Sequence, residues 1–591
     1  MTQETDSQDP HRNEPRVGVY ICHCGGNISD VVDVDAVTKA VESYPGVVLA
    51  KNYIFMCSST GQGLIEDDIK TKGVNRVVVS ACAPALHELT FRGALQRAGL
   101  NPYLYEHVNI REQDSWVHKQ DKKGATEKAI KLTLAAIEKI SRQQELTPIR
   151  VNSEKSAAVI GAGPAGMNAA LALSANGLKV FLVEKDKEPG GNLKTLGRIY
   201  TTGREAGELV KELVTKVKAD RNIELLTGTV VENVSGYVGQ FSLKLKQDGG
   251  AERALKTGAL IITTGFKAYE PYNGEFSYGA DKRVLTLPEF NEKMKAPGAA
   301  EYFRNIKAVS FIHCVGSRQT EGLHKPQADG KINAYCSRIC CTSALHAMQG
   351  MLEKYPHIQA YDYYKDIRTY GLKHEEIYED LSKKGAIFFR YPDDALPEVK
   401  AADDGRLSVK VKDILTWNEE VEASCDLLVL ATGVMPNAIP GLVNSLKLPI
   451  GSDRFLLEAH PKLRPVEIPN MGIFIAGGAQ APMDVQEAAT GAKAASAKAS
   501  MLLSTEHILL DPFVAKVDPD LCDGCEKCVA ECLYAGAIVM KDTPKGRKAE
   551  VLEALCKGCG ACAAVCPRRA INVSGYSLDQ LDAMVEAIAK E

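Results

Sequence analysis

Short apolar runs alternate with amphipathic or Ala-rich segments along the chain, and this pattern predicts an α/β protein. Ala157–Ile160 and Lys179–Val183 are the clearest predicted strands, and Val17–Ile21 begins the same pattern near the N-terminus. The longest predicted helices are the charged, Ala-rich segment Gly124–Gln143 and the segment Val485–Ala499. No run of eighteen apolar residues occurs, so we expect no membrane span.

The predicted strand Ala157–Ile160 leads directly into a glycine motif that is typical of dinucleotide binding. It reads Gly161-x-Gly163-x-x-Gly166, opens an Ala-rich helix, and is followed by a second strand that ends at Glu184. Glycines let the backbone approach a pyrophosphate, the helix N-terminus favours its charge, and Glu184 can accept a bond from a ribose hydroxyl. The candidate residues here are Gly161, Gly163, Pro164, Ala165, Gly166, Glu184, Lys185, Gly191 and Asn192.

Three further stretches, LIITTGF, LLVLATGVMPN and GIFIAGGAQAPMDVQEAATGAKAA, resemble the FAD-binding signatures of thioredoxin-reductase-like disulfide oxidoreductases. The resemblance implies that FAD is the dinucleotide, that Gly472–Ala476 is a strand ending beside its ribitol, and that Val485–Ala499 faces its isoalloxazine. The aspartate common after that strand is absent, and Gln480 or a backbone group is expected to replace it. These stretches add four candidate FAD contacts: Gly265, Gly433, Gly477 and Gln480.

Enzymes of this kind carry a second Rossmann unit for a nicotinamide nucleotide, and here that unit lacks its glycine loop. Lys307–Ile312 is a predicted strand, but HCVGSRQ follows it, so Cys314 stands where the loop is expected. We therefore predict a degenerate nicotinamide subdomain, at about residues 285–425, in which cysteines replace the phosphate-binding loop.

The chain has 591 residues, a formal net charge of −4 and 17 unevenly placed cysteines. The charge does not suggest a nucleic-acid partner. The polar first fifteen residues resemble a disordered tail rather than a signal peptide, which favours a cytoplasmic protein without disulfides. In that setting, clustered cysteines indicate metal or redox chemistry.

The last seventy residues contain C-x2-C-x2-C-x3-C twice, the second copy followed by Pro567, which resembles the bacterial two-cluster ferredoxin. Leu533 stands where the first copy would have proline. Zinc knuckles are the alternative, and eight thiols at this doubled spacing favour two [4Fe–4S] clusters. The resemblance implies one cluster on Cys522, Cys525, Cys528 and Cys566, and another on Cys556, Cys559, Cys562 and Cys532.

Four cysteines near the middle of the chain form a second candidate cluster site: Cys314, Cys336, Cys340 and Cys341. Cys336 and Cys340 would share a face if both were helical, and a helix N-terminus at the adjacent pair would favour a cluster's negative charge. A Cys340–Cys341 disulfide, a zinc site and purely structural thiols are the alternatives. Cys425 is expected to begin a buried strand and to belong to the core.

Near the N-terminus, three predicted strands each stop at cysteine: Val17–Ile21, Tyr53–Met56 and Val77–Ser80. Strand ends of α/β proteins are where ligands bind, so a further cluster on some of Cys22, Cys24, Cys57 and Cys82 is plausible. The alternative is that these are buried apolar cysteines of a small sheet.

The central cysteine set, fused to an FAD domain and a two-cluster ferredoxin, resembles the A subunit of heterodisulfide reductase over nearly the whole chain after residue 15. The resemblance implies a short member, because residues 229–256, where archaeal members often carry an inserted ferredoxin module, contain no cysteine. It implies flavin-based electron bifurcation to ferredoxin and to a disulfide-reducing partner. The alternative is a non-bifurcating flavin and iron–sulfur relay, as in quinone-linked complexes of sulfate reduction, and a cluster-bearing scaffold is a third, non-catalytic possibility.

The implied partners are heterodisulfide-reductase-like B and C subunits, ferredoxin, a hydrogenase-, formate- or NADH-linked input module, and a second copy of the chain. We predict a thioredoxin-reductase-like, Rossmann-type FAD core between an N-terminal α/β domain and a C-terminal ferredoxin. The expected parts are a tail (1–15), an N-terminal domain (16–120), a linker helix (121–150), the FAD domain (151–510), the ferredoxin (511–575) and a C-terminal helix (576–591).

Overall fold

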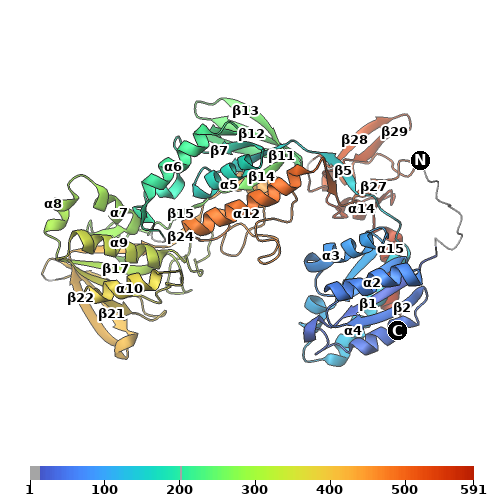
Figure 1. Ribbon diagram of the computed structural model, residues 1–591, viewed down its shortest axis with the longest axis horizontal. Coiled ribbons are helices and arrows are strands. Elements are labelled where there is room, and N and C mark those ends of the chain that lie inside the picture. Colours follow the sequence, from blue (N-terminus) through green and yellow to red (C-terminus); the bar gives the residue numbers. More distant parts are fainter. Residues whose placement is uncertain (1–13, 200–201, 403, 535, 591) are drawn as a thin grey trace. The chain divides into compact units, whose positions relative to one another are not determined.

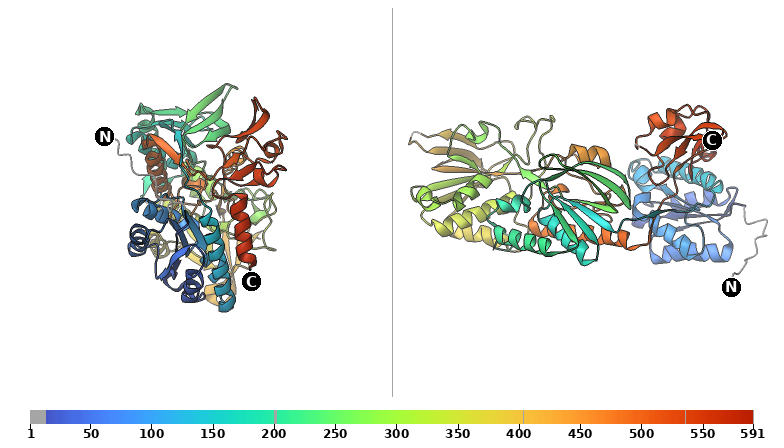
Figure 2. Two further views of the ribbon diagram at one scale, coloured as in Figure 1. Left: turned by 90° about the vertical axis from the view of Figure 1, so that its right-hand side faces the viewer. Right: turned by 90° about the horizontal axis from the view of Figure 1, so that it is seen from above.

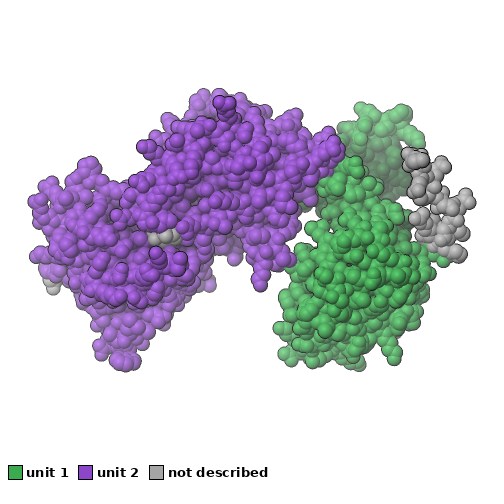
Figure 3. Space-filling model, viewed as in Figure 1, with its two compact units in different colours: residues 1–151, 509–591 green, residues 152–508 purple. Residues whose placement is uncertain are grey.

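The computed structural model describes residues 14–199, 202–402, 404–534 and 536–590, which fall into two compact units. Unit 1 combines the residues up to 151 with those from 509 onward, and unit 2 comprises residues 152–508 (Figure 3). The tail expected at residues 1–15 lies almost entirely outside the described residues. Within the described part, no helix is long and apolar enough to cross a membrane.

The N-terminal part of unit 1 is a four-stranded parallel sheet in the order β2-β1-β3-β4, with helices on both faces (Figure 1). β1 contains two valines and an isoleucine, β3 contains three consecutive valines, and both faces of these strands are buried, as a parallel sheet requires. The strands are β1 (Val17–Cys22), β2 (Val47–Tyr53), β3 (Arg76–Ala81) and β4 (Tyr105–Asn109). The helices are α1 (Val34–Glu42), α2 (Ser59–Lys72), α3 (Pro84–Arg97) and α4 (Lys122–Ser141).

Two predictions for this part were wrong. The second strand is Val47–Tyr53 rather than Tyr53–Met56, because Tyr53 is the last residue paired with β1 and the chain then turns. Met56 is apolar for a different reason, since it is fully buried in that turn. The expected linker helix, α4, is a core element: its buried Ala129, Ile137 and Ile140 pack in the same cluster as β1.

The ferredoxin segment belongs to the same unit as the N-terminal sheet. The C-terminal helix α15 (Leu578–Ala589) runs alongside α4 (Figure 2). Arg92 of α3 pairs with Asp511 at 2.9 Å, and its guanidinium lies 5.0 Å from the Tyr103 ring and 5.1 Å from the Phe513 ring. The segment's elements are β27 (Ala515–Val517), α13 (Lys527–Glu531), β28 (Ile538–Thr543), β29 (Gly546–Val551), α14 (Ala561–Ala564) and β30 (Ile571–Val573).

A buried ion pair inside unit 1 gives a stability prediction. Lys139 Nζ lies 2.6 Å from Glu106 Oε2 and 3.6 Å from the centre of the Tyr576 ring, and its side chain is 3% exposed. We expect Lys139→Met to cost about 3–5 kcal/mol, because it leaves the Glu106 carboxylate buried without its partner. Hydrogen exchange of the α4 and α15 amides in the intact chain measures this as lost protection.

The double variant Lys139→Met/Glu106→Gln is the matched control, because it removes the unpaired charge along with its partner. It should recover part of the lost protection. Equal protection in the single variant and the parent chain would show that this pair contributes nothing to the packing of α15.

Unit 2 contains two parallel five-stranded sheets. The first has the order β10-β7-β6-β14-β25, and α5 packs against α12 beside it. Alanines at the α5–α12 contact allow the two helices to approach closely. The elements are β6 (Ser156–Ile160), α5 (Pro164–Ala175), β7 (Lys179–Val183), α6 (Ala206–Ala219), β10 (Ile223–Leu226), β14 (Ala259–Ile262), β25 (Ile473–Ile475) and α12 (Val485–Ser504). An antiparallel sheet of β11 (Thr229–Tyr237), β12 (Gln240–Gln247) and β13 (Glu252–Thr257) spans the region without cysteines.

The second sheet has the order β16-β23-β17-β18-β19. Its strands and flanking helices are β16 (Val284–Thr286), α7 (Leu287–Lys295), α8 (Ala299–Arg304), β17 (Ala308–Val315), α9 (Cys340–Lys354), β18 (Gln359–Tyr364), α10 (His374–Lys383), β19 (Ile387–Arg390) and β23 (Leu427–Thr432). The antiparallel strands β20 (Glu398–Ala401), β21 (Leu407–Asp413) and β22 (Glu419–Cys425) pack beside it. Smaller elements are β5 (Ile149–Asn152), β8 (Arg198–Ile199), β9 (Arg204–Glu205), β15 (Phe266–Ala268), β24 (Val434–Pro436), α11 (Pro440–Leu446) and β26 (His507–Leu510).

Two further details of this part of unit 2 differ from expectation. The strand predicted at Lys307–Ile312 continues to Val315 and so includes Cys314. Cys425 is fully buried, as a core residue should be, but it ends β22 rather than beginning a strand.

Candidate functional site

The glycine loop after β6 has the close approaches that the dinucleotide motif requires. A Cβ on Gly161 would lie 2.5 Å from the Thr263 carbonyl oxygen, and one on Gly166 would lie 1.8 Å from that of Gly161. Gly163 is different, because its nearest neighbour would be the Gly191 Cα at 4.0 Å. Gly161 and Gly166 therefore serve the packing of the chain, while the face of Gly163 stays open toward a ligand.

Glu184 lies at the end of β7, and the loop itself holds its carboxylate. Oε2 accepts a hydrogen bond from the Ala162 amide at 2.6 Å, and Oε1 accepts one from the Asp186 amide at 3.0 Å. The side chain is buried. These bonds orient the carboxylate beside the glycine loop, where the predicted contact with a ribose hydroxyl would be made.

The other predicted FAD contacts differ in how the chain holds them. A Cβ on Gly477 would meet the Ala165 Cβ at 2.6 Å, so the segment after β25 reaches the start of α5. Asn192 donates to the Phe266 carbonyl at 2.8 Å, and Gln480 donates to the Pro465 carbonyl at 2.7 Å, so both amides are held within the chain. The Lys185 side chain is exposed, and Gly265 has a positive φ of 70°.

Gly433 lies elsewhere in unit 2. Its amide donates to the Val315 carbonyl at 2.8 Å, and a Cβ there would lie 2.6 Å from Ser337 Oγ. It therefore borders the segment that carries the central cysteines.

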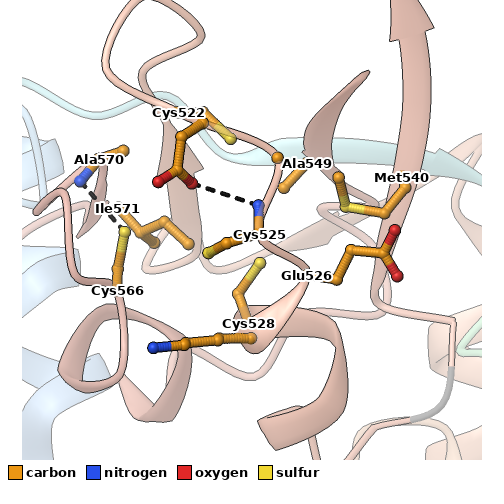
Figure 4. Close-up of a pocket in the computed structure, with 12 residues that line it drawn as sticks. Cys522, Cys525, Glu526, Cys528, Met540, Ala549, Cys566, Ala570 and Ile571 are labelled. Carbon is orange, nitrogen blue, oxygen red and sulfur yellow. Dashed lines mark hydrogen bonds between the residues drawn. The ribbon is translucent and has the colours of Figure 1, made fainter. Parts of the chain in front are cut away.

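The eight C-terminal cysteines line two separate cavities. Cys522, Cys525, Cys528 and Cys566 surround the first, shown in Figure 4, and the second is lined by Cys532, Cys556, Cys559 and Cys562. These are the two sets that the ferredoxin resemblance implies, with the last cysteine of each motif exchanged between them. The exchange arises because α13 and α14 pack against each other and bring the two motifs together.

Backbone amides donate hydrogen bonds to two of these sulfurs. The Ala570 amide donates to Cys566 Sγ at 3.3 Å (Figure 4), and the Gly558 and Ala515 amides each donate to Cys556 Sγ at 3.4 Å. Burial raises the pKa of the Cys562 thiol to about 11, so as a free thiol it would stay protonated. Coordination to iron deprotonates such a thiol outright, so the buried donors and their amide bonds suit a cluster.

The central cysteines lie at the exit of β17 and the start of α9. Cys314 lies within the register shift of β17, between Ile312 and Val315, and has a φ of +60°, so the bulge redirects its side chain. Cys340 and Cys341 are the first residues of α9 and are both buried. Cys336 precedes the helix, so the expected helical face shared with Cys340 does not exist; its sulfur instead accepts a hydrogen bond from the Arg338 amide at 3.3 Å.

A buried histidine–aspartate pair, which was not among the residues predicted from the sequence, supports the central cysteines. His313 Nε2 lies 2.9 Å from Asp362 Oδ1, and both side chains are fully buried. Burial alone would lower the pKa of His313, but Asp362 and then Cys341 outweigh it and raise that pKa to about 10. Hydrogen bonding from Cys340, and then from His313, lowers the pKa of Cys341 well below its usual range. The available signal was a histidine directly before Cys314 on a buried strand.

All seventeen cysteines are free, so the Cys340–Cys341 disulfide that we considered is not formed. Among the described residues, no three His, Cys, Asp or Glu side chains converge closely enough to hold a single metal ion. A cubane holds its thiolates further apart than one ion does.

The N-terminal cysteines gather at the carboxyl edge of their sheet. Cys22 ends β1, Cys82 directly follows β3, and the Cys24 amide donates to Cys22 Sγ at 3.3 Å. Cys57 lies in the turn four residues beyond β2, close enough to Cys24 for their charges to interact. Cys22 and Cys82 are buried, whereas Cys24 and Cys57 are only half-buried.

Comparison with known proteins identifies two of these parts directly. Residues 155–298 match the pyridine nucleotide-disulphide oxidoreductase family, and residues 521–570 match the 4Fe–4S dicluster domain. Thioredoxin reductase of Lactococcus lactis overlaps loosely, with 19% identity, a TM-score of 0.41, and coverage of 59% of this chain and 99% of that one. Together with the dinucleotide loop and the paired cysteine cavities, the family matches define an oxidoreductase with an FAD-binding domain and an iron–sulfur dicluster domain.

Full-length relatives identify the family. The A subunit of the H2:CoB-CoM heterodisulfide,ferredoxin reductase of Methanothermobacter thermautotrophicus is 34% identical over 91% of this chain and 92% of its own. The A subunit of the H2/formate:CoB-CoM heterodisulfide,ferredoxin reductase of Methanococcus maripaludis is 33% identical, over 88% of this chain and 90% of its own length. The chain belongs to the family of heterodisulfide reductase A subunits. The first alignment spans 621 positions, more than the 591 residues of the chain, so that relative contains residues without a counterpart here.

Proposed function

We propose that this chain is the flavin and iron–sulfur subunit of a heterodisulfide-reductase-like complex that divides a flavin electron pair between ferredoxin and a disulfide-reducing partner. The observation that carries the proposal is the exit of β17. Where a nicotinamide-binding unit would have a glycine loop, the chain has Cys314 on a bulge, facing the cysteines at the start of α9. Bound FAD exchanges electrons in pairs, and iron–sulfur clusters pass them singly.

The residues proposed to hold each group follow from the sites above. The open face of Gly163, the loop from Gly161 to Gly166 and Glu184 would bind FAD. The two C-terminal sets would each hold a [4Fe–4S] cluster. A third cluster is proposed on Cys314, Cys336, Cys340 and Cys341, and a fourth on Cys22, Cys24, Cys57 and Cys82. Each set combines buried thiols with less buried ones, which suits a cluster enclosed near the protein surface.

The partners are proposed from the relatives. The name of the Methanothermobacter thermautotrophicus relative specifies H2, and that of the Methanococcus maripaludis relative specifies H2 or formate. The name of the Methanosarcina acetivorans relative specifies ferredoxin and F420H2. We infer an input module linked to hydrogenase, formate or NADH, B and C subunits that carry the disulfide-reducing site, and a homodimer within the complex. A cytoplasmic location is consistent with these partners.

A non-bifurcating relay is the second candidate, and the length of the chain favours it. The alignment with the Methanothermobacter thermautotrophicus protein is longer than this chain, so fewer positions are available here for additional clusters. Residues 229–256 of this chain contain no cysteine, so this segment supplies no ligands for an inserted ferredoxin module.

The deciding experiment uses the purified complex with its reductant, a low-potential ferredoxin and a disulfide acceptor. Bifurcation predicts that ferredoxin is reduced only while the second acceptor is present, with equal numbers of electrons delivered to each. Omitting the second acceptor is the control. Ferredoxin reduction at the same rate without it would establish a simple relay. The iron content of the chain should be about twelve to sixteen atoms, from three or four cubanes.

A further inference from the structure

Arg111 lies among the N-terminal cysteines and directly contacts one of them. It follows β4 at the carboxyl edge of the sheet and begins the one-turn π-helix Arg111–Ser115. Its Nη1 donates a hydrogen bond to Cys24 Sγ at 3.1 Å. A guanidinium keeps its charge at every relevant pH, so this sulfur has a permanent cation beside it.

Two neighbours fix the orientation of the guanidinium. Glu112 Oε1 accepts from Nη2 at 2.5 Å and from Nε at 3.1 Å. The guanidinium also lies over the Trp116 ring, with its central carbon 4.6 Å from the ring centre. With Nε and Nη2 held by Glu112, Nη1 is the group that remains directed at Cys24.

The same charge also acts on two other cysteines of the set. Burial raises the pKa of Cys57 and raises that of Cys82 to about 12, and in both cases Arg111 opposes the rise. Arg111 therefore interacts electrostatically with three of the four cysteines of the set, and it contacts Cys24 directly. The nearby His87 and His107 have pKa values lowered by burial, so they stay neutral and add no comparable charge.

We propose that Arg111 is the charge-compensating residue of the N-terminal cysteine site and that it raises the reduction potential of the iron–sulfur cluster held there. This rests on the proposed function only in assuming that a cluster binds to this site. Four thiolates and a cubane carry net negative charge, and reduction adds one more electron. A fixed cation at hydrogen-bond distance from a ligand sulfur stabilises the reduced, more negative state over the oxidised one.

The test is a redox titration of the intact holoprotein, followed by electron paramagnetic resonance. The N-terminal signal is first assigned as the one that Cys57→Ser abolishes, together with about four iron atoms. Arg111→Gln should then lower the potential of this signal by at least 59 mV, a tenfold change in the one-electron equilibrium. Arg111→Lys keeps the charge but loses the planar fork, so it should restore part of the shift.

Glu112→Gln is the matched control with the opposite sign. It removes the negative charge that partly offsets Arg111, so it should raise the potential of the same signal. General loosening of the loop would instead move both variants in one direction or leave both unchanged, and either result would overturn the role of Arg111. If Arg111→Gln fails to assemble the cluster, the opposed shifts expected for Glu112→Gln and Arg111→Lys still decide the question.

The failure of this inference is distinguishable from failure of the N-terminal cluster itself. If Cys57→Ser leaves the iron content and all signals unchanged, no cluster binds there, and both proposals are wrong. If Cys57→Ser removes a signal that Arg111→Gln and Glu112→Gln do not move, the cluster stands and only the role of Arg111 is refuted.

Discussion

Replacing Gly163 by alanine should abolish most FAD binding while leaving the fold of unit 2 intact. The added methyl would meet no protein atom closer than the Gly191 Cα at 4.0 Å, so the chain itself has room for it. The φ of Gly163 is −75°, which alanine adopts without strain. The methyl would instead occupy the face where the motif brings the pyrophosphate against the backbone. We expect at least a tenfold loss of FAD affinity, measured by flavin content and by titration of the apoprotein.

Two other glycines provide controls for this result. Gly166→Ala would place a Cβ 1.8 Å from the Gly161 carbonyl oxygen, so it should lower both flavin content and apoprotein stability. Gly207 lies in α6, and a Cβ there would meet open space. Gly207→Ala should therefore leave the flavin content unchanged and should not lower the stability. If Gly163→Ala retains the full flavin complement, the pyrophosphate does not lie at this loop.

Replacing Cys336 by serine should remove about four iron atoms per chain, corresponding to one cubane, while the flavin content stays the same. Cys336 is the least buried of the four central cysteines and lies in a loop before α9, so serine is tolerated there without a cavity. Iron and acid-labile sulfide analysis, with flavin absorbance on the same sample, measures both quantities.

Cys425→Ser is the matched control, because Cys425 is a buried cysteine of the same sheet region that belongs to none of the four sets. It should leave the iron content unchanged, although it places a hydroxyl in the core. Equal iron in Cys336→Ser and the parent chain would refute the central cluster, and iron loss in Cys425→Ser would refute the ligand assignment.

Local motifs in the sequence were sufficient to predict much of the candidate site. The strand, glycine loop, helix and acid from Ala157 to Glu184 form one contiguous unit, so their spacing in the chain already places them together in space. The doubled C-terminal motif is similar, because each cluster set draws three of its four cysteines from one short segment. Contacts of this short range follow from local geometry.

Other features depended on contacts between distant segments. Asp362 meets His313 only because β18 pairs with β17, and neither residue lies in a motif that suggests the contact. Arg111 reaches Cys24 across 87 positions of sequence, because β4 and β1 end at the same edge of one sheet. The apolar pattern misplaced β2 because a buried turn residue, Met56, is as apolar as a strand residue.

By itself, the sequence predicted an FAD-type dinucleotide loop, a two-cluster ferredoxin, and a cysteine, Cys314, where a nicotinamide-binding unit would have its glycine loop. Only the tertiary structure decided which charged side chains lie beside the cysteines. It also decided that the first and last segments of the chain form one compact unit, in which α15 packs against α4. The reason is physical. Ligand spacing within a motif is set by the local backbone, whereas the neighbours of a buried thiol are set by strand order and helix packing.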